Sequence, residues 1–465
     1  MSSSAAAPVT QPPRPGPPTR VALPGLSPSS RLYMGTEAGG SALLLLGTVA
    51  ALIWANSPWS AGYSSFWTTP ATIGVGDLAL TLDLRHWVND AAMALFFLVV
   101  GLEITREVTS GELRDRRSLT APALGALGGL TVPAGLYLLI NHSGPASAGW
   151  GVVMSTDTAF VLGVLALFGP RCPDRLRLFL LTLAIVDDIG AITVMAVSYS
   201  GRIDGVALAV SGALVAVLAV LRWARVWRLT PYVLTGVALW LAVQASGVHP
   251  TLAGVLLGLL IPSRPPGAEV VQRTRSYERA LREEPDAERA RLAALAAAAA
   301  VPAGERLQYR LHRWTAYAVV PVFGLANAGV ALDGAALRAA ATSPVTLGVW
   351  AALVVGNAVG ITVGTTIALR TGWGVLPGGV RWSHLVAGAT LAGIGFTISL
   401  FITDLAFPDA ALRQQATIGI LAGSLTAAIA GVVLLRILGE RFPLCSPEQE
   451  GPPSLPPRPW LQPTG

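Results

Sequence analysis

Two adjacent acids, Asp187 and Asp188, lie within the apolar stretch LTLAIVDDIGAITV at residues 181–194. Neighbouring carboxylates repel one another when both are ionised, so at least one is expected to hold a proton near physiological pH. Hard cations prefer carboxylate and carbonyl oxygens and would displace that proton. The pair therefore predicts one set of oxygens for which protons and a cation such as Na+ or Li+ compete. The alternative is a pair satisfied by neighbouring hydroxyl groups, with no role in transport.

Two further acids, Asp90 and Asp157, lie in other apolar stretches, and Thr156 precedes Asp157. An ionised side chain at the centre of a membrane costs about 2.5–3.5 kcal/mol on insertion scales, and an ion pair is the usual reason that one is tolerated. The chain has no Lys, and no Arg falls at the centre of a predicted span. These acids are therefore expected to be protonated, to face a solvated cavity or to hold a cation, unless neighbouring groups satisfy them.

Glycines interrupt one apolar stretch, because Gly393 and Gly395 flank Ile394 in TLAGIGFTISLFI. Hydroxyl residues surround Asp157 in another, VVMSTDTAFVLG. Interrupted spans in corresponding positions of two halves indicate a binding site built from broken helices. We therefore expect broken helices at residues 149–169 and 384–407. Close helix packing, which small residues permit anywhere in a membrane bundle, is the alternative for the two glycines.

Apolar stretches long enough to cross a hydrocarbon core of about 30 Å recur along the chain. With 52% hydrophobic and 12% charged residues, the composition predicts an all-α polytopic membrane protein. About twelve spans are predicted, centred on residues 40–56, 86–104, 119–140, 149–169, 177–199, 204–221, 230–246, 248–262, 314–331, 344–369, 384–407 and 414–436.

The arginines are distributed unevenly between the two sides of this topology. If the N-terminus is cytoplasmic, 28 of the 32 Arg lie in cytoplasmic segments, and the exceptions are Arg85, Arg202, Arg338 and Arg413. The positive-inside rule then places both termini in the cytoplasm. The net charge of +6 reflects this asymmetry and an attraction to anionic lipid, and no basic stripe with interleaved aromatics indicates nucleic-acid binding.

Residues 35–437 are expected to form one membrane transport domain, with disordered Pro-rich tails at 1–34 and 438–465. The charged cytoplasmic loop 263–313 favours a helix, either as a solvated linker or with a regulatory role. Between the first two spans, TIGVGDLALTLDL predicts an external β-hairpin that turns at Gly76 and Asp77. Cys172 and Cys445 fall on the cytoplasmic side, so neither a disulfide nor a Cys and His metal site is predicted.

A charged cluster follows the second span in GLEITREVTSGELRDRR, which includes Glu103, Arg106 and Glu107. The spacings suit ion pairs along a helix, so the cluster predicts either a helix cap or a proton-collecting, pH-responsive funnel. His249 lies beside Pro250 in SGVHPTLAG. It is either a packing residue at a helix start or a group that titrates near neutral pH.

Six segments resemble, in order, the NhaA family of bacterial Na+/H+ antiporters: WVNDAAMALFFLVVGLEITRE, STDTAFVLGVLALFG, LAIVDDIGAI, SGVHPTLAGV, FGLANAGVAL and GIGFTISLFI. The resemblance covers about residues 35–437. It implies a twelve-helix inner-membrane antiporter with inverted structural repeats, in which broken spans 4 and 11 cross. It also implies export of Na+ or Li+ in exchange for protons, no cofactor beyond these ions, and a homodimer formed partly through the hairpin at residues 72–84.

The resemblance assigns roles to individual residues. Asp188 matches the family's principal cation ligand, and Asp187 its neighbour in exchange. Asp157 with Thr156 matches the pair at the helix crossing, where the acid balances the positive ends of half-helix dipoles. Asp90 matches the family's acid in the second span, and His249 matches its His linked to pH response. The family's cytoplasmic entrance is matched by Glu103, Arg106 and Glu107.

Two positions depart from the family pattern. The family has a Lys in the tenth span that pairs with the first acid of the dyad, but LVVGNAVGI places Asn357 there. Asn can donate a hydrogen bond to Asp187 but cannot carry a positive charge. Asp187 is therefore expected to stay protonated over a wider pH range than beside a Lys, and the exchange of two protons per Na+ does not follow. Gln308 stands nearest to a family Glu linked to pH sensing, so the pH set point does not follow either.

Other functional classes fit the sequence less well. Residues 74–77 spell the GxGD of intramembrane aspartyl proteases, but they fall in a predicted external loop and no Tyr-Asp dipeptide provides a partner acid. No enzymatic activity is therefore predicted. A sodium-coupled symporter, a passive cation channel and a cation-binding sensor on the same fold are the alternatives to antiport.

Overall fold

The computed structural model describes residues 28–75, 78–110, 116–168, 174–224, 226, 228–263, 268–376 and 380–441. Within the chain, residues 33–445 form one compact unit. Most of both predicted tails, the hairpin turn at Gly76 and Asp77, and the two cysteines lie outside the described residues. Helix α1 begins at Pro28, so the end of the segment 1–34 that was predicted to be disordered is helical.

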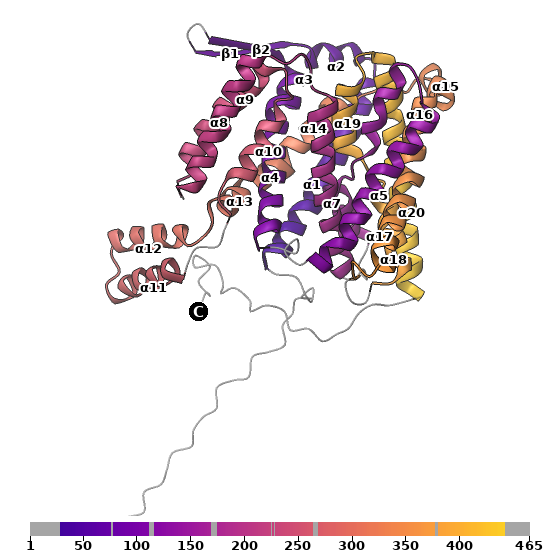
Figure 1. The fold of residues 1–465 in the computed structure, drawn as a ribbon. Helices are drawn as coiled ribbons and strands as arrows, with labels where there is room; N and C mark the ends of the chain where they lie inside the picture. Colours follow the sequence, from indigo (N-terminus) through magenta and orange to yellow (C-terminus); the bar gives the residue numbers. More distant parts are fainter. Residues whose placement is uncertain are drawn as a thin grey trace, which may run out of the picture. The chain divides into compact units, whose positions relative to one another are not determined.

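The chain is mostly helical, and Figure 1 shows the helices and the two strands coloured by their position in the sequence. The α-helices are α1 (Pro28–Ala55), α2 (Ser60–Trp67), α3 (Leu84–His86), α4 (Met93–Ser110), α5 (Arg116–Ile140), α6 (Thr158–Phe168), α7 (Asp174–Ser198), α8 (Gly205–Trp223), α9 (Thr230–Ser246), α10 (Thr251–Leu260), α11 (Ala268–Glu283), α12 (Ala287–Ala299), α13 (Ala303–Trp314), α14 (Val320–Asn327), α15 (Gly334–Thr342), α16 (Pro344–Ala351), α17 (Asn357–Arg370), α18 (Trp382–Leu391), α19 (Phe396–Ala406) and α20 (Ala410–Arg441). Segments of other helix types are η1 (Trp87–Ala92), η4 (Thr315–Val319) and η5 (Ala352–Gly356), which are π-helical, and the 3-10 helix η3 (Pro145–Val153).

Six of the described helices are long and apolar enough to cross a membrane, or up to nine spans if each of three bent pairs counts as one. The six are Leu84–Thr109, Leu119–Ile140, Leu176–Ser198, Gly205–Trp223, Pro344–Arg370 and Ala410–Leu438, and each coincides with a predicted span to within a few residues. The bent pairs are Gly39–Ala55 with Ser60–Trp67, Pro145–Val153 with Thr158–Leu165, and Trp382–Leu391 with Phe396–Ala406. Three predicted spans, at 230–246, 248–262 and 314–331, correspond to the shorter helices α9 and α10 and to η4 with α14.

The predicted hairpin is present as strands β1 (Pro70–Val75) and β2 (Leu78–Asp83), which pair antiparallel. Thr72 lies opposite Thr81, and their hydroxyl oxygens are 2.8 Å apart. Asp83 ends the hairpin and caps α3, because its Oδ1 accepts a 2.7 Å hydrogen bond from the His86 amide. The hairpin therefore leads directly into the long helix that carries Asp90.

The two ends of the bundle differ, and Figure 1 shows them at the top and bottom of the view. The hairpin end carries β1, β2, α2 and α15, whereas α11, α12 and α13 lie at the opposite end, named here the loop end. The charged loop predicted to contain a helix forms the pair α11 and α12, followed by α13. Asp286 caps α12 by accepting a hydrogen bond from the Arg289 amide.

The helices pack as two groups. In the α4 group, α4 packs against α10, α13 and η4, α14 packs against η1 and η4, and α9 packs against α8 and α10. In the α5 group, α5 packs against α7 and α17, and α20 packs against α16, α18 and α19. Contacts between the groups are sparser, mainly α4 with α7 and α14 with α19. We call the boundary between the two groups the seam. Both cavities described in the next section are lined by residues of both groups and so lie on it.

Candidate functional site

Two broken helices meet at the centre of the site. The pairs η3 with α6 and α18 with α19 are each bent by 45° at their break. The Asp157 amide donates a 2.6 Å hydrogen bond to the Ile394 carbonyl, and the Thr156 hydroxyl donates a 2.9 Å bond to the Ala392 carbonyl. Backbone groups at one break that have no hydrogen-bond partner within their own helix therefore find partners at the other break.

Gly393 and Gly395 permit this close approach. A Cβ atom built on Gly393 would collide with the Leu353 carbonyl oxygen of η5, and one on Gly395 would lie 2.7 Å from the Ser155 carbonyl oxygen at the other break. A side chain at either position would have to displace the neighbouring chain. The sequence offered two interpretations of these glycines, a helix break and close packing. The structure shows both, because the glycines lie at the break and contact their neighbours closely.

Asp157 lies between the N-terminal ends of two half-helices. Its Oδ1 accepts a 3.0 Å hydrogen bond from the Phe160 amide at the start of α6. Its Oδ2 accepts a 3.0 Å bond from the Thr397 amide at the start of α19. The partial positive charges of both helix ends therefore face one carboxyl group that is 3% exposed.

Asp187 and Asp188 extend from α7 toward this crossing and are both buried. The Thr156 amide donates a 2.7 Å hydrogen bond to Asp187 Oδ2. Among the described residues, neither Asp187 Oδ1 nor Asp188 Oδ1 has a hydrogen-bond partner. The structure thus brings together Thr156, Asp157, Asp187 and Asp188 and leaves two carboxyl oxygens able to hold a proton or a cation.

Further buried polar atoms lie near the crossing. The hydroxyl oxygens of Ser155 and Ser399 are buried and, within the described residues, lack hydrogen-bond partners. Over all the residues that the structure describes, no group of three or more His, Cys, Asp or Glu side chains could hold a metal ion. The hydroxyl and backbone oxygens at the breaks are therefore the oxygens available to complement the carboxylates of α7.

A cavity of about 60 Å³ lies beside two of the acids, toward the loop end of the seam. Asp157 and Asp188 line it together with Glu103 of α4 and His312 of α13. His312 was not identified from the sequence, where it lies in the charged loop without a recognisable motif. Burial and the nearby Arg106 guanidinium lower the pKa of His312 to about 4, so this side chain is neutral at physiological pH.

The predicted cluster at the end of the second span also forms. Arg106 Nη2 lies 3.2 Å from Glu107 Oε1 and 4.0 Å from Glu103 Oε1. Arg106 Nη1 donates a 3.5 Å bond to Gln308 Oε1, which joins α4 to α13. Gln308 therefore lies beside the cluster.

Asp90 and His249 are not part of the crossing site. They line a second cavity, of about 310 Å³, at the hairpin end of the seam, together with Gln244 and Asp404. His249 Nε2 lies 3.7 Å from Asp90 Oδ1, and its Nδ1 lies 2.8 Å from the Thr251 hydroxyl. The acid of the second span thus faces the opposite end of the molecule from Glu103.

Three buried aromatic rings occupy the seam near the hairpin-end cavity. Phe401 of α19 lies with its ring centroid 5.5 Å from that of Phe97 and 6.3 Å from that of Phe323. Phe401 also contacts His249, at 5.0 Å between ring centroids. Because Thr397 lines the loop-end cavity and Phe401 the hairpin-end cavity, α19 runs from one cavity to the other.

Asn357 does not donate a hydrogen bond to Asp187. It is 1% exposed at the start of α17, and its Nδ2 has no hydrogen-bond partner among the described residues. The Asp187 oxygen that does accept a bond accepts it from Thr156. The short amide therefore leaves an unmatched polar group at this position.

Comparison with known proteins gives consistent matches. The family model described as Na+/H+ antiporter 1 matches residues 31–435. The chain is 63% identical over 456 residues to Na(+)/H(+) antiporter NhaA 3 of Frankia alni, which covers 98% of each chain. It is 46% identical over 412 residues to Na(+)/H(+) antiporter NhaA 1 of Mycolicibacterium vanbaalenii, covering 89% of this chain and 67% of the relative. The NhaA 1 antiporter of Acidiphilium cryptum is 43% identical over 427 residues, covering 90% of this chain and 94% of the relative.

The apolar helices and these matches define a multi-pass membrane transporter that exchanges Na+ for protons. The chain belongs to the NhaA family of Na+/H+ antiporters. The resemblance identified from the six sequence segments is therefore confirmed.

Proposed function

We propose that Asp187 and Asp188 form the exchange site, at which protons and Na+ or Li+ bind alternately. The proposal rests chiefly on two buried carboxyl oxygens, Asp187 Oδ1 and Asp188 Oδ1, that lack hydrogen-bond partners within the described residues. They lie on adjacent residues beside the helix breaks, where Thr156 and Asp157 bring further oxygens. A cation that enters this cluster replaces the protons that otherwise neutralise the pair.

The cavities suggest the order of events. The site that opens toward Glu103 and His312 loads Na+ from the loop end, and binding releases protons toward the same side. A movement at the seam then exposes the site to the cavity lined by Asp90 and His249, where Na+ leaves and protons bind. Asp157 holds the positive ends of α6 and α19 in place during the exchange.

The loop end is cytoplasmic in this proposal, and the hairpin end faces outward across the bacterial inner membrane. This orientation follows the distribution of Arg and places both termini in the cytoplasm. Residues 35–437 form the transport domain, of about twelve spans with inverted repeats, in which the two broken helices cross. The exposed hairpin edges, β1 and β2, join two copies of the chain as a homodimer.

The other site residues predicted from the sequence have supporting roles in this scheme. Glu103, Arg106 and Glu107 collect protons and cations at the cytoplasmic entrance. Asp90 and His249 act at the outward cavity. Asn357 replaces a positive charge, so the ratio of protons to Na+ is set by the carboxylates alone. The transported ions are the only ligands that the proposal requires.

A transport assay tests the site. Inverted membrane vesicles are loaded with a proton gradient, Na+ or Li+ is added, and internal pH is monitored. Asp188→Asn is expected to abolish cation-driven proton release at neutral and alkaline pH, because an amide cannot exchange a proton for a cation. The control is Asp204→Asn, which changes an exposed cap of α8 and should retain exchange. Equal proton release by Asp188→Asn and the unaltered protein would refute the assignment of the site.

A further inference from the structure

The seam must open on alternate sides if the exchange site is to face each side in turn. The loop-end cavity is lined by residues of both helix groups, including Glu103 of α4 and Asp188 of α7. The hairpin-end cavity is likewise shared, with Asn89 and Asp90 contributed by η1 and Asp404 by α19. A bond that crosses the seam at the hairpin end therefore opposes opening toward the outside.

Such a bond joins Asn89 to Asp404. Asn89 Nδ2 donates a 3.2 Å hydrogen bond to Asp404 Oδ2, although 315 residues separate the two. Asn89 is 4% exposed. Its amide is also paired reciprocally with that of Asn327, at 3.1 and 2.8 Å, within the α4 group. Asn89 is therefore held in one orientation by its own side of the seam.

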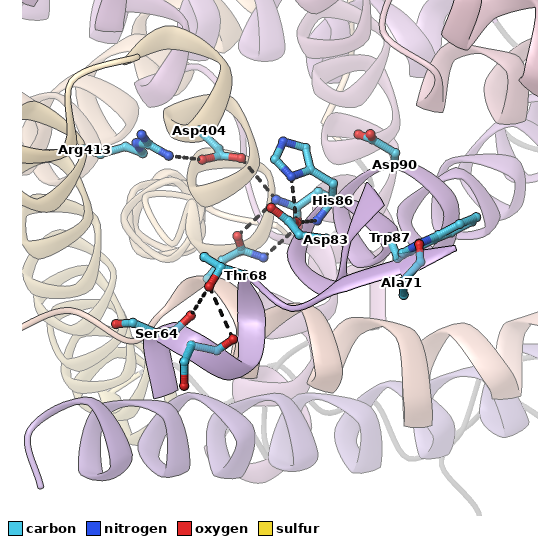
Figure 2. Close-up of polar contacts among 12 residues, drawn as sticks. Ser64, Thr68, Ala71, Asp83, His86, Trp87, Asp90, Asp404 and Arg413 are labelled. Atoms are coloured by element: carbon cyan, nitrogen blue, oxygen red, sulfur yellow. Dashed lines mark hydrogen bonds and ion pairs between the residues drawn. The ribbon is translucent and has the colours of Figure 1, made fainter. Parts of the chain in front are cut away.

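Arg413 holds the acid from the other side. Its Nη1 lies 2.8 Å from Asp404 Oδ1, and its Nη2 donates a 3.1 Å bond to the Pro408 carbonyl. Figure 2 shows the Arg413 guanidinium directed at the Asp404 carboxyl group, on the side away from His86. Arg413 and Asp404 belong to α20 and α19, which pack together in the α5 group.

We propose that the hydrogen bond between Asn89 and Asp404 is an outer latch, which keeps the seam closed at the hairpin end while the exchange site faces the cytoplasm. Of these three contacts, the bond between Asn89 and Asp404 is the one that crosses between the groups, whereas the bonds of Asn89 to Asn327 and of Asp404 to Arg413 each lie within one group. Opening outward breaks the latch and leaves both halves otherwise intact. Arg413 is a positioning residue, because it fixes the carboxylate that Asn89 meets.

The latch deepens the proposed exchange cycle and rests on it, because it assumes that the site at Asp187 and Asp188 faces both sides in turn. Its strength suits a reversible device. A hydrogen bond to a charged group contributes modestly when water can replace it, and the Asp404 side chain is 24% exposed. Removing the bond is expected to shift the balance toward the outward-open form by about tenfold, without unfolding the protein.

A cross-link tests whether the seam parts at this point. Asn89→Cys and Asp404→Cys are combined in a chain whose Cys172 and Cys445 are replaced by Ser. A short bifunctional thiol reagent should join the pair and stop Na+/H+ exchange, and a reducing agent should restore it. Each single substitution with the same treatment should keep exchange. If a fully cross-linked protein, verified by mass spectrometry, still exchanges ions, the latch is refuted.

Thiol labelling gives a second measurement that does not depend on the cross-link. Ile398→Cys places a thiol in the loop-end cavity, and a membrane-impermeant maleimide is added from outside the cell. Adding Asp404→Ala should raise the labelling rate about tenfold, and Arg413→Gln should raise it by a smaller factor. Asp409→Ala and Arg338→Gln are the matched controls, because they change hairpin-end charges that do not cross the seam. Unchanged labelling in Asp404→Ala would contradict the proposal.

These readings separate the latch from the exchange site. If Asp188→Asn still exchanges ions, the proposed exchange site fails, yet the cross-link and labelling still report whether the seam opens at Asn89. If Asp188→Asn is inactive and Asp404→Ala leaves labelling unchanged, the site stands and the latch fails.

Discussion

The Asp157 amide donates a 2.6 Å hydrogen bond to the carbonyl oxygen of Ile394, so the two helix breaks are bound directly to one another. The Thr156 hydroxyl and the Asp157 carboxylate add further bonds across the same junction. Backbone groups released at the breaks are thereby satisfied inside the protein, as a membrane interior requires. The two breaks are consequently one joined structure, and a change on either broken helix should affect both.

Gly393→Ala tests how tightly the α18 break packs against its neighbours. The added methyl group would collide with the Leu353 carbonyl oxygen and force the α18 break away from η5, so the variant is expected to lose about 1–3 kcal/mol of stability. Thermal unfolding of the purified protein in detergent measures the loss. Gly135→Ala in α5 is the control, because a Cβ there meets nothing within 4 Å and should be neutral or slightly stabilising. Equal midpoints for the two variants would contradict tight packing at this break.

Asp157→Asn tests the role of a carboxylate between two helix ends. One amide oxygen can still accept a bond from Phe160 or Thr397, but the amide nitrogen would face the other backbone N–H and carry no charge. Exchange is expected to fall on the order of tenfold or more, since bonds to charged groups are about twice as strong as neutral ones.

The matched control is Asp333→Asn. Asp333 also accepts hydrogen bonds from two helix-start amides, those of Ala335 and Ala336, but on the exposed helix α15. It should keep normal exchange in proteoliposomes. A similar loss in both variants would show that a general capping defect, and not the crossing, underlies the effect.

The sequence predicted the buried acids and the helix breaks because its signals are local. Adjacent acids in an apolar stretch, and glycines around Ile394, are unusual enough within one span to indicate an exchange site and a helix break. The hairpin was predictable for the same reason, since alternating residues around a turn specify both strands. The long helices followed from uninterrupted apolar stretches.

The residues that the sequence did not reveal depend on tertiary contacts. Asp404 lies at the end of a predicted span, where an acid normally meets water, and its partner Asn89 is 315 residues away. His312 lies in a charged loop, and only the folding of α13 against α4 brings it to the cavity of Asp188. Spacing along one chain cannot indicate such pairs, because no local period connects them.

His312→Gln tests the pH dependence of stability. Burial beside Arg106 lowers the pKa of His312 from 6.5 to about 4, so between these values the unfolded chain binds a proton that the folded chain does not. Folding stability therefore falls as the pH is lowered from 6.5 to 4. Removing the imidazole should reduce this acid-induced loss by on the order of 1 kcal/mol, measured as unfolding midpoints across that range.

The control for this experiment is Leu311→Ala, which changes an apolar side chain of the same helix α13 and removes no titrating group. Its acid-induced loss should match that of the unaltered protein. Parallel pH profiles for His312→Gln and the unaltered protein would mean that the imidazole titrates alike in the folded and unfolded chains.

Asn357→Lys tests how the missing cation shapes exchange. Asn357 is 1% exposed and its Nδ2 lacks a partner within the described residues. In the proposed scheme, a Lys at this position pairs with a carboxylate of the dyad, as the resemblance to the family implies. A positive charge there favours the ionised form of the pair, so Na+ can compete with protons at lower pH. The pH of half-maximal exchange in proteoliposomes is expected to fall by about one unit. Asn357→Gln lengthens the amide without adding charge and should leave that pH unchanged. If the Lys and Gln variants share one pH profile, charge at this position does not act on the exchange site.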